Sequence, residues 1–333
     1  MKVAILFDDV DARADATPDE RGVLEAVDAV EAALAAEGHA PVRVPVGAAT
    51  GAWLGRLERE APDVAYNLCE GVAGRADLEP HVAAVVELLG LPMTGCAAET
   101  LALCRRKDRV NALLGQAGIP VPAWTVTWPA RDGAHAARVA AGWVRFPAIV
   151  KPAGEDGSVG ITQASVAPDE AALGRALTAA APFGDVLVQE FVGRREVVVG
   201  IVGDEVLPPA EIDFAALPAG LSPMVSYEAK WSAGSAEDVG TRPVCPADVS
   251  EEVEERARAL AADAWRLVGG RGYGRVDFRL DEDGSLHLIE VNPNPDLAPV
   301  AGLARMADAH GWSYRELVAR ILLGATPHGR RQR

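Results

Sequence analysis

The stretch YGRVDFRL at residues 273–280 is followed by the turn DEDG at 281–284 and by SLHLIEV at 285–291. The alternation in both outer stretches predicts two strands, and Asp-Gly between them is a strong hairpin signal. Successive side chains of a strand point to opposite faces. One face of the first strand then carries Tyr273, Arg275, Asp277 and Arg279, and we expect one face of the second to carry Leu286, Leu288, Glu290 and Asn292.

The polar faces of this hairpin predict a metal site. If the two faces coincide, Asp277, Glu290 and Asn292 converge, with Arg275 beside them. Two carboxylates and an amide oxygen suit Mg²⁺ better than zinc, and so few protein ligands normally share the metal with substrate phosphates. The rigid exit 292–295, Asn-Pro-Asn-Pro, would fix one asparagine. The alternative interpretation is a solvated hairpin face with ion pairs.

A second candidate site is the sequence KPAGEDGSVG at 151–160, which begins with Lys151 at the end of a predicted strand. Glycines allow backbone N–H groups to approach an anion closely, so this loop could hold a nucleotide phosphate. It lacks the Gly-Lys-Ser/Thr of a Walker A loop, and it does not open a helix, because Ile161 and the following residues are predicted as strand. The alternative is a plain glycine hairpin.

Lysine is rare in this chain. Only four of the 32 basic residues are lysines: Lys2, Lys107, Lys151 and Lys230. Each could have a role that the broad planar guanidinium of arginine cannot fill. Drift in codon usage is the alternative explanation.

The segment Gln189-Glu190-Phe191-Val192 is a candidate hinge between domains. Its exposed backbone could bind an adenine edge, and Glu196 could hold ribose hydroxyls. The Arg-Arg-Glu that ends at Glu196 is otherwise typical of surface charge.

The N-terminal part of the chain predicts a parallel α/β layer of roughly a hundred residues, because strands and helices alternate. The helix that starts at the Thr17–Glu20 capping box continues to Gly38. The other predicted elements are the strands Val3–Phe7, Val42–Val46 and Val64–Leu68 and the helix Leu78–Leu89.

The rest of the chain predicts a mixed middle segment and a larger α+β segment. For the middle we expect helices over Ala98–Ala117 and Pro168–Ala180 and strands at Trp124–Thr127, Ala148–Lys151 and Gly160–Ser165. For the end we expect an antiparallel meander of Val186–Phe191, Glu196–Val202 and Val206–Ile212 and a helix over Glu251–Val268. The predicted domains are 1–97, 98–183 and 184–325, with a disordered tail at 326–333.

Composition excludes several classes of protein. A chain of 333 residues with 49% apolar residues can build more than one core. The net charge of −16 argues against nucleic-acid binding. No run approaches eighteen apolar residues, which argues against a membrane span, and the start MKVAILFDDVD does not resemble a signal peptide. The cysteines form no CxxC pair and suggest buried thiols in a reducing cytosol, so we expect a cytoplasmic protein; they are Cys69, Cys96, Cys104 and Cys245.

Together these motifs resemble the ATP-grasp superfamily, and their order and spacing are most similar to the D-alanine–D-alanine ligase group. The resemblance runs from about Asn67 to Leu317. It rests on Arg106-Lys107-Asp108, the Lys-Pro and glycine loop, Glu196, Lys230, Arg275-x-Asp277 and Glu290-x-Asn292. It implies three domains: a Rossmann-like N-terminal domain, a small lid domain, and a C-terminal α+β domain, with ATP between the last two.

The resemblance also implies roles for individual residues. Lys107, Lys151 and Lys230 would contact ATP phosphates, and a loop with Glu155, Gly157 and Ser158 would cover them. Gln189, Phe191 and Val192 would meet adenine, and Glu196 would meet the ribose. Asp277, Glu290 and Asn292 would bind two Mg²⁺ ions, with Mn²⁺ as a substitute, while Arg275 would stabilise the tetrahedral intermediate and Ser158 would share in catalysis.

The implied reaction is activation of a carboxylate by ATP to an acyl phosphate, followed by attack of an amine and release of ADP and phosphate. Its partners would be a small carboxylic acid and an amine, with no nucleic acid and no membrane. A homodimer through the N-terminal domain is suggested by the resemblance alone. A non-catalytic ATP-binding module is a competing hypothesis, and the complete metal trio with Arg275 argues against it.

The chain departs from the group where the group binds its amino acids. The group's Gly-Gly-x-Ser-x-Glu is replaced by Phe7-Asp8-Asp9-Val10, and its His-Gly is replaced by Glu70-Gly71 after Cys69. Its tyrosine after the loop lysine is Trp231, and its Asn-Thr-x-Pro-Gly ends here in Asp296. The serine that fixes the acceptor carboxylate would fall near Ala301-Gly302. We therefore expect substrates other than two D-alanines, with Glu70, Trp231 and Asp296 as substrate residues; an authentic D-alanine–D-alanine ligase is the alternative.

Overall fold

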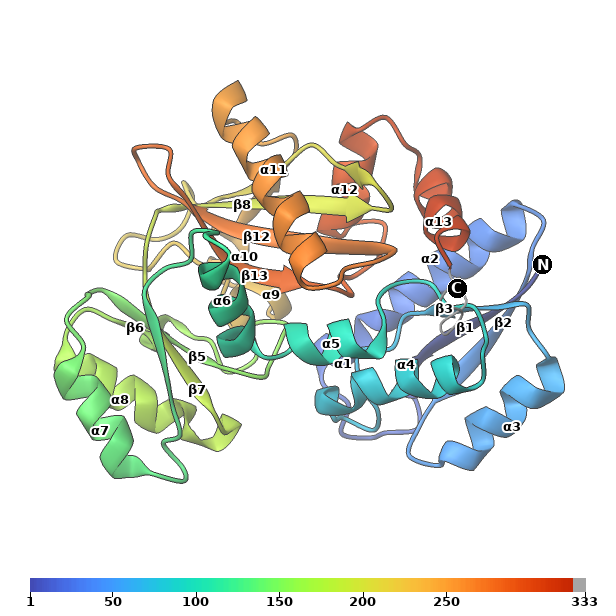
Figure 1. Ribbon diagram of the computed structural model, residues 1–333, viewed down its shortest axis with the longest axis horizontal. Coiled ribbons are helices and arrows are strands. Elements are labelled where there is room, and N and C mark those ends of the chain that lie inside the picture. Colours follow the sequence, from blue (N-terminus) through green and yellow to red (C-terminus); the bar gives the residue numbers. More distant parts are fainter. Residues whose placement is uncertain (326–333) are drawn as a thin grey trace.

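The computed structural model describes residues 1–325, which form three lobes around a central cleft (Figure 1). The predicted tail at 326–333 lies outside the described residues. Within the described part, no helix combines the length and the apolar character that crossing a membrane requires.

The N-terminal lobe is a parallel three-stranded sheet in the order β2-β1-β3, which confirms the predicted α/β layer. Its elements are β1 (Lys2–Asp8), α1 (Pro18–Arg21), α2 (Val23–Ala36), β2 (Ala40–Val46), α3 (Thr50–Glu60), β3 (Val64–Asn67), η1 (Ala76–Leu78) and α4 (Glu79–Leu88). One of the two hydrogen bonds of the predicted capping box is present, since the Thr17 amide donates to Glu20 Oε2 at 2.8 Å. The helix predicted to run to Gly38 divides at Gly22 into α1 and α2.

The middle lobe has a four-stranded sheet in the order β4-β7-β5-β6 and its own hydrophobic core, which lies between the sheet and α7 and α8. Helices α5 (Ala98–Cys104) and α6 (Lys107–Gln116) lead into it, and both lie within the helical segment predicted at Ala98–Ala117. Its other elements are β4 (Trp124–Thr127), α7 (Gly133–Gly142), β5 (Ala148–Pro152), η2 (Gln163–Ser165), β6 (Val166–Ala167), α8 (Glu170–Ala180), η3 (Ala181–Phe183) and β7 (Val186–Glu190).

Two predictions for this region are wrong. Residues 160–165 form a turn and the short helix η2 instead of a strand, because the side chain of Thr162 caps that helix. The strand β7 pairs with β4 and β5 instead of opening a meander with the following strands. A short apolar run indicates a buried strand without indicating its partner. The domain ranges remain predictions, and the pairing of β7 favours a boundary after Glu190.

The C-terminal lobe is an antiparallel sheet in the order β11-β10-β8-β12-β13, with β9 added to β8. Its elements are β8 (Arg195–Val202), β9 (Glu205–Val206), β10 (Ala210–Asp213), α9 (Tyr227–Trp231), α10 (Ala236–Val239), β11 (Arg242–Val244), α11 (Glu251–Leu267), β12 (Tyr273–Leu280), β13 (Leu286–Asn292), α12 (Gly302–Ala309) and α13 (Tyr314–Leu323). Helix α11 packs on one face of this sheet, and α12 packs on β8 from the other side.

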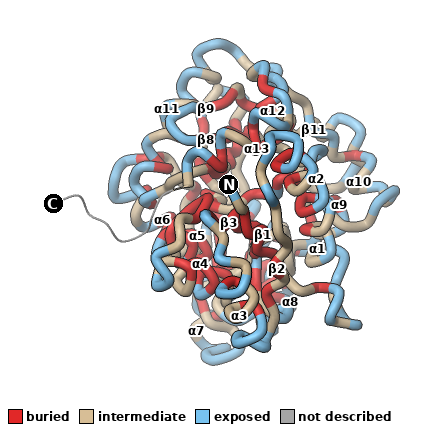
Figure 2. Tube along the Cα trace, turned by 90° about the vertical axis from the view of Figure 1, so that its right-hand side faces the viewer, coloured by how far each residue is buried: buried red, intermediate tan, exposed pale blue. Residues whose placement is uncertain are grey.

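The N-terminal and C-terminal lobes share their hydrophobic cores, whereas the middle lobe keeps a separate one. Figure 2 shows buried stretches running through the strands while the outer helices alternate between buried and exposed residues. Helix α13 returns to pack against α2, and Arg315 forms a 2.6 Å ion pair with Glu37 at the end of α2. The middle lobe is therefore the part most able to move as a lid over the other two.

Candidate active site

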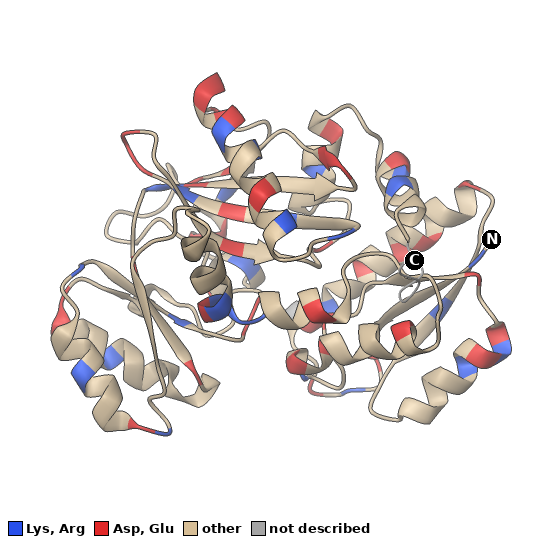
Figure 3. Ribbon diagram, in the orientation of Figure 1, with Lys and Arg blue, Asp and Glu red and all other residues tan. Residues whose placement is uncertain are grey.

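A cavity of about 1320 Å³ lies where the three lobes meet. Every residue that the sequence analysis proposed for the site lines it: Glu70, Lys107, Lys151, Glu155, Gly157, Ser158, Gln189, Phe191, Val192, Glu196, Lys230, Trp231, Arg275, Asp277, Glu290, Asn292 and Asp296. Acidic and basic residues occur in all three lobes (Figure 3), but three of the four lysines line this cavity. The fold brings the proposed residues together, and their individual roles remain predictions.

The metal-binding face of the hairpin forms through a β-bulge that the sequence analysis did not foresee. Asp277 pairs with Glu290, whereas Phe278 pairs with Leu288, so Ile289 is an extra residue on β13. The extra residue turns Leu286 and Leu288 into the core beneath α11, while Glu290 and Asn292 face the cavity. The prediction that these four side chains share one face is therefore wrong. A bulge re-aims side chains in this way because it shifts the alternation by one residue.

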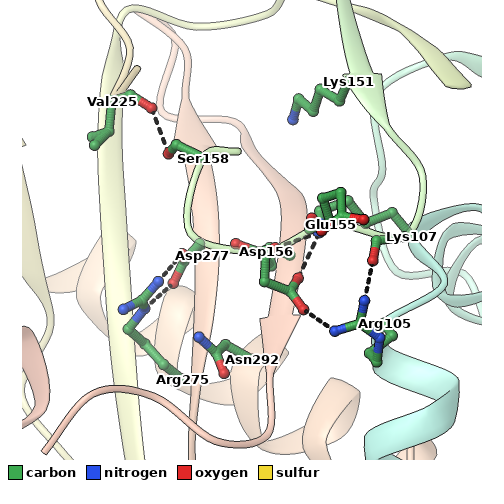
Figure 4. A network of polar contacts seen from close by, with 12 residues as sticks. Arg105, Lys107, Lys151, Glu155, Asp156, Ser158, Val225, Arg275, Asp277 and Asn292 are labelled. Atoms are coloured by element: carbon green, nitrogen blue, oxygen red, sulfur yellow. Dashed lines mark hydrogen bonds and ion pairs between the residues drawn. The ribbon is translucent and has the colours of Figure 1, made fainter. Parts of the chain in front are cut away.

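The proposed metal ligands are already neutralised by neighbouring cations. Arg275 forms a bidentate pair with Asp277 at 2.8 and 2.9 Å (Figure 4). Lys107 Nζ lies 2.9 Å from Glu290 Oε1. Burial opposes ionisation of the Glu290 carboxyl, but Lys107, Arg275 and Lys151 outweigh it and lower its pKa to about 2. The Glu290 carboxylate is therefore available as an anionic ligand at neutral pH.

The donor set fits Mg²⁺. Asp277, Glu290 and Asn292 present carboxylate and amide oxygens to the cavity, which are the ligands that Mg²⁺ prefers. Among residues 1–325, no cluster of three His, Cys, Asp or Glu side chains is arranged to hold a metal. A protein site with only two carboxylates and an amide leaves positions that phosphate oxygens can fill.

Two buried lysines reach the cavity from different elements. Lys107 begins α6, and its Nζ donates to Asp156 Oδ1 at 2.8 Å and to the Glu155 carbonyl at 2.6 Å. Lys151 on β5 donates to Gln189 Oε1 at 3.2 Å and forms no ion pair in the part of the chain that the structure describes. Burial lowers the pKa of Lys151 to about 8. A bound phosphate would be an anionic partner for this ammonium group.

The glycine-rich loop is held against the C-terminal lobe by hydrogen bonds. Ser158 has a φ of 63°, and its hydroxyl donates to the Val225 carbonyl at 2.9 Å. Trp231 Nε1 on α9 donates to the Gly157 carbonyl at 2.9 Å, and the Tyr227 amide donates to the Ile161 carbonyl at 2.9 Å. These bonds place Trp231 at the loop, with Lys230 4.9 Å from its ring.

The sequence analysis missed two residues that organise this loop. Arg105 donates to the Gly154 carbonyl and lies 3.6 Å from Asp156, as Figure 4 shows. Asp156 also forms an ion pair with Lys107. Its carboxylate therefore contacts the ammonium that is expected to bind phosphate. The position of Arg105 two residues before Lys107 was a signal for it, whereas nothing in the sequence indicated the partners of Asp156.

The end of the cavity next to the N-terminal lobe is acidic. Asp8 accepts from the Gly71 amide at 3.1 Å, and burial, with Glu70 adding to it, raises the pKa of its carboxyl well above the usual value. Asp296 accepts from the Ala298 amide at 2.8 Å, which fixes its carboxylate at the edge of the cavity. The N-terminal lobe and the exit of the hairpin therefore bring three carboxyls to one end of the cleft.

Comparisons with known proteins agree with this architecture. Residues 113–323 match the family model for the D-ala D-ala ligase C-terminus. The chain is 36% identical over 250 residues to the D-alanine–D-alanine ligase of Pseudoalteromonas translucida (strain TAC 125), covering 75% of this chain and 76% of the relative. It is also 36% identical over 260 residues to that of Alcanivorax borkumensis, covering 77% and 76%. The fold matches the D-alanine–D-alanine ligase from Bacillus anthracis complexed with ATP, with a TM-score of 0.74, 19% identity and 97% of each chain covered.

The chain, whose three lobes surround a cavity lined by three lysines, is an ATP-grasp enzyme. The chain belongs to the D-alanine–D-alanine ligase family. It is an ATP-dependent ligase that forms a C–N bond, acts on small molecules and uses ATP and Mg²⁺.

Proposed function

We propose that this ligase joins a small carboxylic acid to an amine through an acyl phosphate, and that its substrates are other than two D-alanines. The observation that carries the substrate proposal is the acidic end of the cavity, where Asp8, Glu70 and Asp296 gather. The group that this chain resembles has Gly-Gly and His-Gly at two of these places. A cationic amine there would offset the burial and the repulsion from Glu70 that raise the pKa of Asp8, so this end of the cavity favours a substrate that presents one.

In the first step, a carboxylate oxygen of the acid attacks the γ-phosphorus of ATP, the bond to the β-phosphate oxygen breaks, and ADP leaves. Such a transfer depends on positioning and on neutralisation of developing charge. Lys107 and Lys151 would supply positive charge at the phosphates. Two Mg²⁺ ions, when held by Asp277, Glu290 and Asn292, would neutralise the phosphate oxygens further.

In the second step, the amine attacks the acyl carbon, phosphate leaves, and the nitrogen loses a proton. Arg275 would stabilise the negative oxygen of the tetrahedral intermediate, since its guanidinium already faces the cavity beside Asp277. Acyl phosphates are readily hydrolysed, so water must be kept out. The bonds from Ser158 and Trp231 that hold the glycine-rich loop down support this shielding role.

The test is release of ADP with Mg-ATP and a panel of D- and L-amino acids, diamines and dipeptides, offered singly and in pairs. The proposal predicts release that requires one specific pair, with the amide identified by mass. Release with D-alanine alone would contradict the substrate proposal. Tight ATP binding with no release for any pair would favour the non-catalytic module.

Variants of the acidic end test its role in selecting the substrate. Glu70→Gln and Asp296→Asn keep the size of each side chain while removing a negative charge. We expect each to raise the KM for the amine-bearing substrate and to leave the KM for ATP unchanged. If the KM values for the organic substrates stay unaltered, these carboxylates do not select the substrate.

A second candidate, an authentic D-alanine–D-alanine ligase, is favoured by the relatives at 36% identity, which carry that name. It predicts that D-alanine alone supports turnover at a rate no other pair exceeds. The same panel therefore separates the two candidates.

A further inference from the structure

Arg279 is a buried arginine on β12 to which the reaction assigns no task. It shares the cavity-facing side of that strand with Arg275 and Asp277, and only 3% of its surface is exposed. A buried guanidinium must find partners for its five N–H groups, because leaving them unpaired in a low-dielectric interior is costly. The partners of Arg279 therefore indicate what it does.

Two of these partners belong to the segment expected to meet adenine. Arg279 Nε donates to the Val192 carbonyl at 3.1 Å, and Nη2 donates to the Gly193 carbonyl at 2.7 Å. The guanidinium also lies 5.0 Å from the centre of the Phe191 ring. The segment runs close to β12, because a Cβ on Gly193 would lie only 2.7 Å from the Leu280 carbonyl oxygen. Arg279 and the glycine together fix the path of the segment.

The remaining partners come from two other walls of the cavity. Arg279 Nη1 donates to the Pro223 carbonyl at 2.8 Å and to Glu196 Oε2 at 3.4 Å. Pro223 precedes Met224 and Val225, which line the cavity. Glu196 lies on β8 directly across the sheet from Arg279. One side chain thus connects the adenine segment, the 223–225 loop and the carboxylate expected to meet the ribose.

We propose that Arg279 is a positioning residue for the nucleotide: it orients the Glu196 carboxylate toward the ribose hydroxyls and holds residues 191–193 at the adenine. The inference rests on the proposed roles of Phe191, Val192 and Glu196 and is independent of the identity of the acid and the amine. A charged hydrogen bond fixes a carboxylate more firmly than a neutral one does. Loss of Arg279 should therefore lower the affinity for ATP and also remove the preference for ATP over a nucleotide that lacks a ribose hydroxyl.

The test measures binding of Mg-ATP and of Mg-2′-deoxy-ATP to the full chain by calorimetry, with no acid or amine present. Failure of the proposed ligation would leave this measurement unaffected. Arg279→Met keeps a long side chain but removes every donor. We expect it to weaken ATP binding at least about tenfold and to weaken 2′-deoxy-ATP binding much less, so that the preference for ATP disappears. Glu196→Gln should lose the same preference, and the double variant should lose no more.

Matched variants separate positioning from damage to the fold. Arg194→Met removes an exposed arginine from the same segment and should leave both affinities unchanged. Arg279→Lys, which keeps the charge and some donors, should restore part of the preference; if the methionine variant does not fold, the lysine variant alone decides. The proposal is overturned if either variant binds both nucleotides more weakly by the same factor, or if the preference for ATP is unchanged.

Discussion

Lys151 is the residue whose protonation the fold controls most directly. Its ammonium is buried and bonded to the amide oxygen of Gln189, without a carboxylate at ion-pair distance among the described residues. Burial disfavours the charged form, which is why the pKa falls from the usual 10.5 to about 8. The other charged groups that affect it are Glu290, Lys107, Glu196 and Arg279.

ATP binding should therefore take up protons above pH 8. The free protein loses the Lys151 proton as pH rises through about 8, whereas bound phosphates favour the charged form and raise the pKa again. We expect affinity for ATP to fall as pH rises beyond 8, by up to about tenfold per unit. Calorimetry at pH 8.5 in two buffers of different ionisation enthalpy measures the uptake. Lys151→Arg, which stays charged, should abolish it; equal uptake in that variant would assign the proton to another group.

Arg305 on α12 is a second cationic residue that we expect to affect substrate binding. It lines the cavity close to Ala301 and Gly302 and makes no ion pair within residues 1–325. We expect it to bind a carboxylate where the amine-bearing substrate carries one, as an amino acid does. Arg305→Ala should raise the KM for that substrate by roughly tenfold and leave the KM for ATP unchanged, since charged hydrogen bonds contribute about 1.5–3 kcal/mol. Steady-state kinetics would measure the KM for the amine-bearing substrate and the KM for ATP. A change in the KM for ATP alone would refute this prediction.

Among the elements, the hairpin of β12 and β13 shows which features could be predicted from the sequence and which could not. Alternation placed Arg275 and Asp277 on one face of β12, because the period of a strand is fixed. The same rule failed on β13, because the bulge at Ile289 depends on pairing with β12. The strands that pair with β7 could not be predicted for the same reason, because the order of strands in a sheet depends on contacts between distant parts of the chain. Motif spacing could therefore predict the members of the site but not the contacts of Asp156 or Arg279.

The glycine-rich loop gives a prediction at this scale. Trp231→Phe keeps an aromatic ring but removes the N–H that donates to the Gly157 carbonyl. A less firmly held loop should admit water to the acyl phosphate, so the ratio of phosphate released to amide formed should rise severalfold. Trp53→Phe, a buried tryptophan in α3 far from the loop in sequence, is the matched control and should leave the ratio unchanged. A ratio of one in both variants would mean that the Trp231 bond has no shielding role.

For the whole molecule, the N-terminal and C-terminal lobes are joined beside the cavity by Asn294. Its Nδ2 donates to the Cys69 carbonyl at 2.8 Å and to Glu79 at 3.0 Å, and its Oδ1 accepts from the Tyr273 hydroxyl at 2.7 Å. The division into three segments could be predicted from the sequence pattern, whereas the placing of ATP between the last two came only from the family resemblance. The contacts of Asn294 with Cys69 and Glu79 join residues more than two hundred positions apart, so local sequence patterns do not reveal them.

Removing this junction should destabilise the molecule. Asn294→Ala removes hydrogen bonds to three polar partners, including the buried Glu79 carboxyl, at a cost of about 2–3 kcal/mol in the free energy of unfolding. Denaturant unfolding of the variant and the parent measures the difference. Asn292→Ala is the comparison: it removes a proposed metal ligand and should change stability less while abolishing turnover. Equal stability of Asn294→Ala and the parent would contradict the structural role given to this side chain.

The central claim, ligation through an acyl phosphate, is tested most directly by following oxygen. The acid substrate is labelled with ¹⁸O in its carboxylate, and the phosphate released during turnover is analysed by mass. The mechanism predicts one ¹⁸O atom in each phosphate, because the bridging oxygen of the acyl phosphate leaves with phosphorus when the amine attacks carbon. Amide formation with unlabelled phosphate would contradict the account.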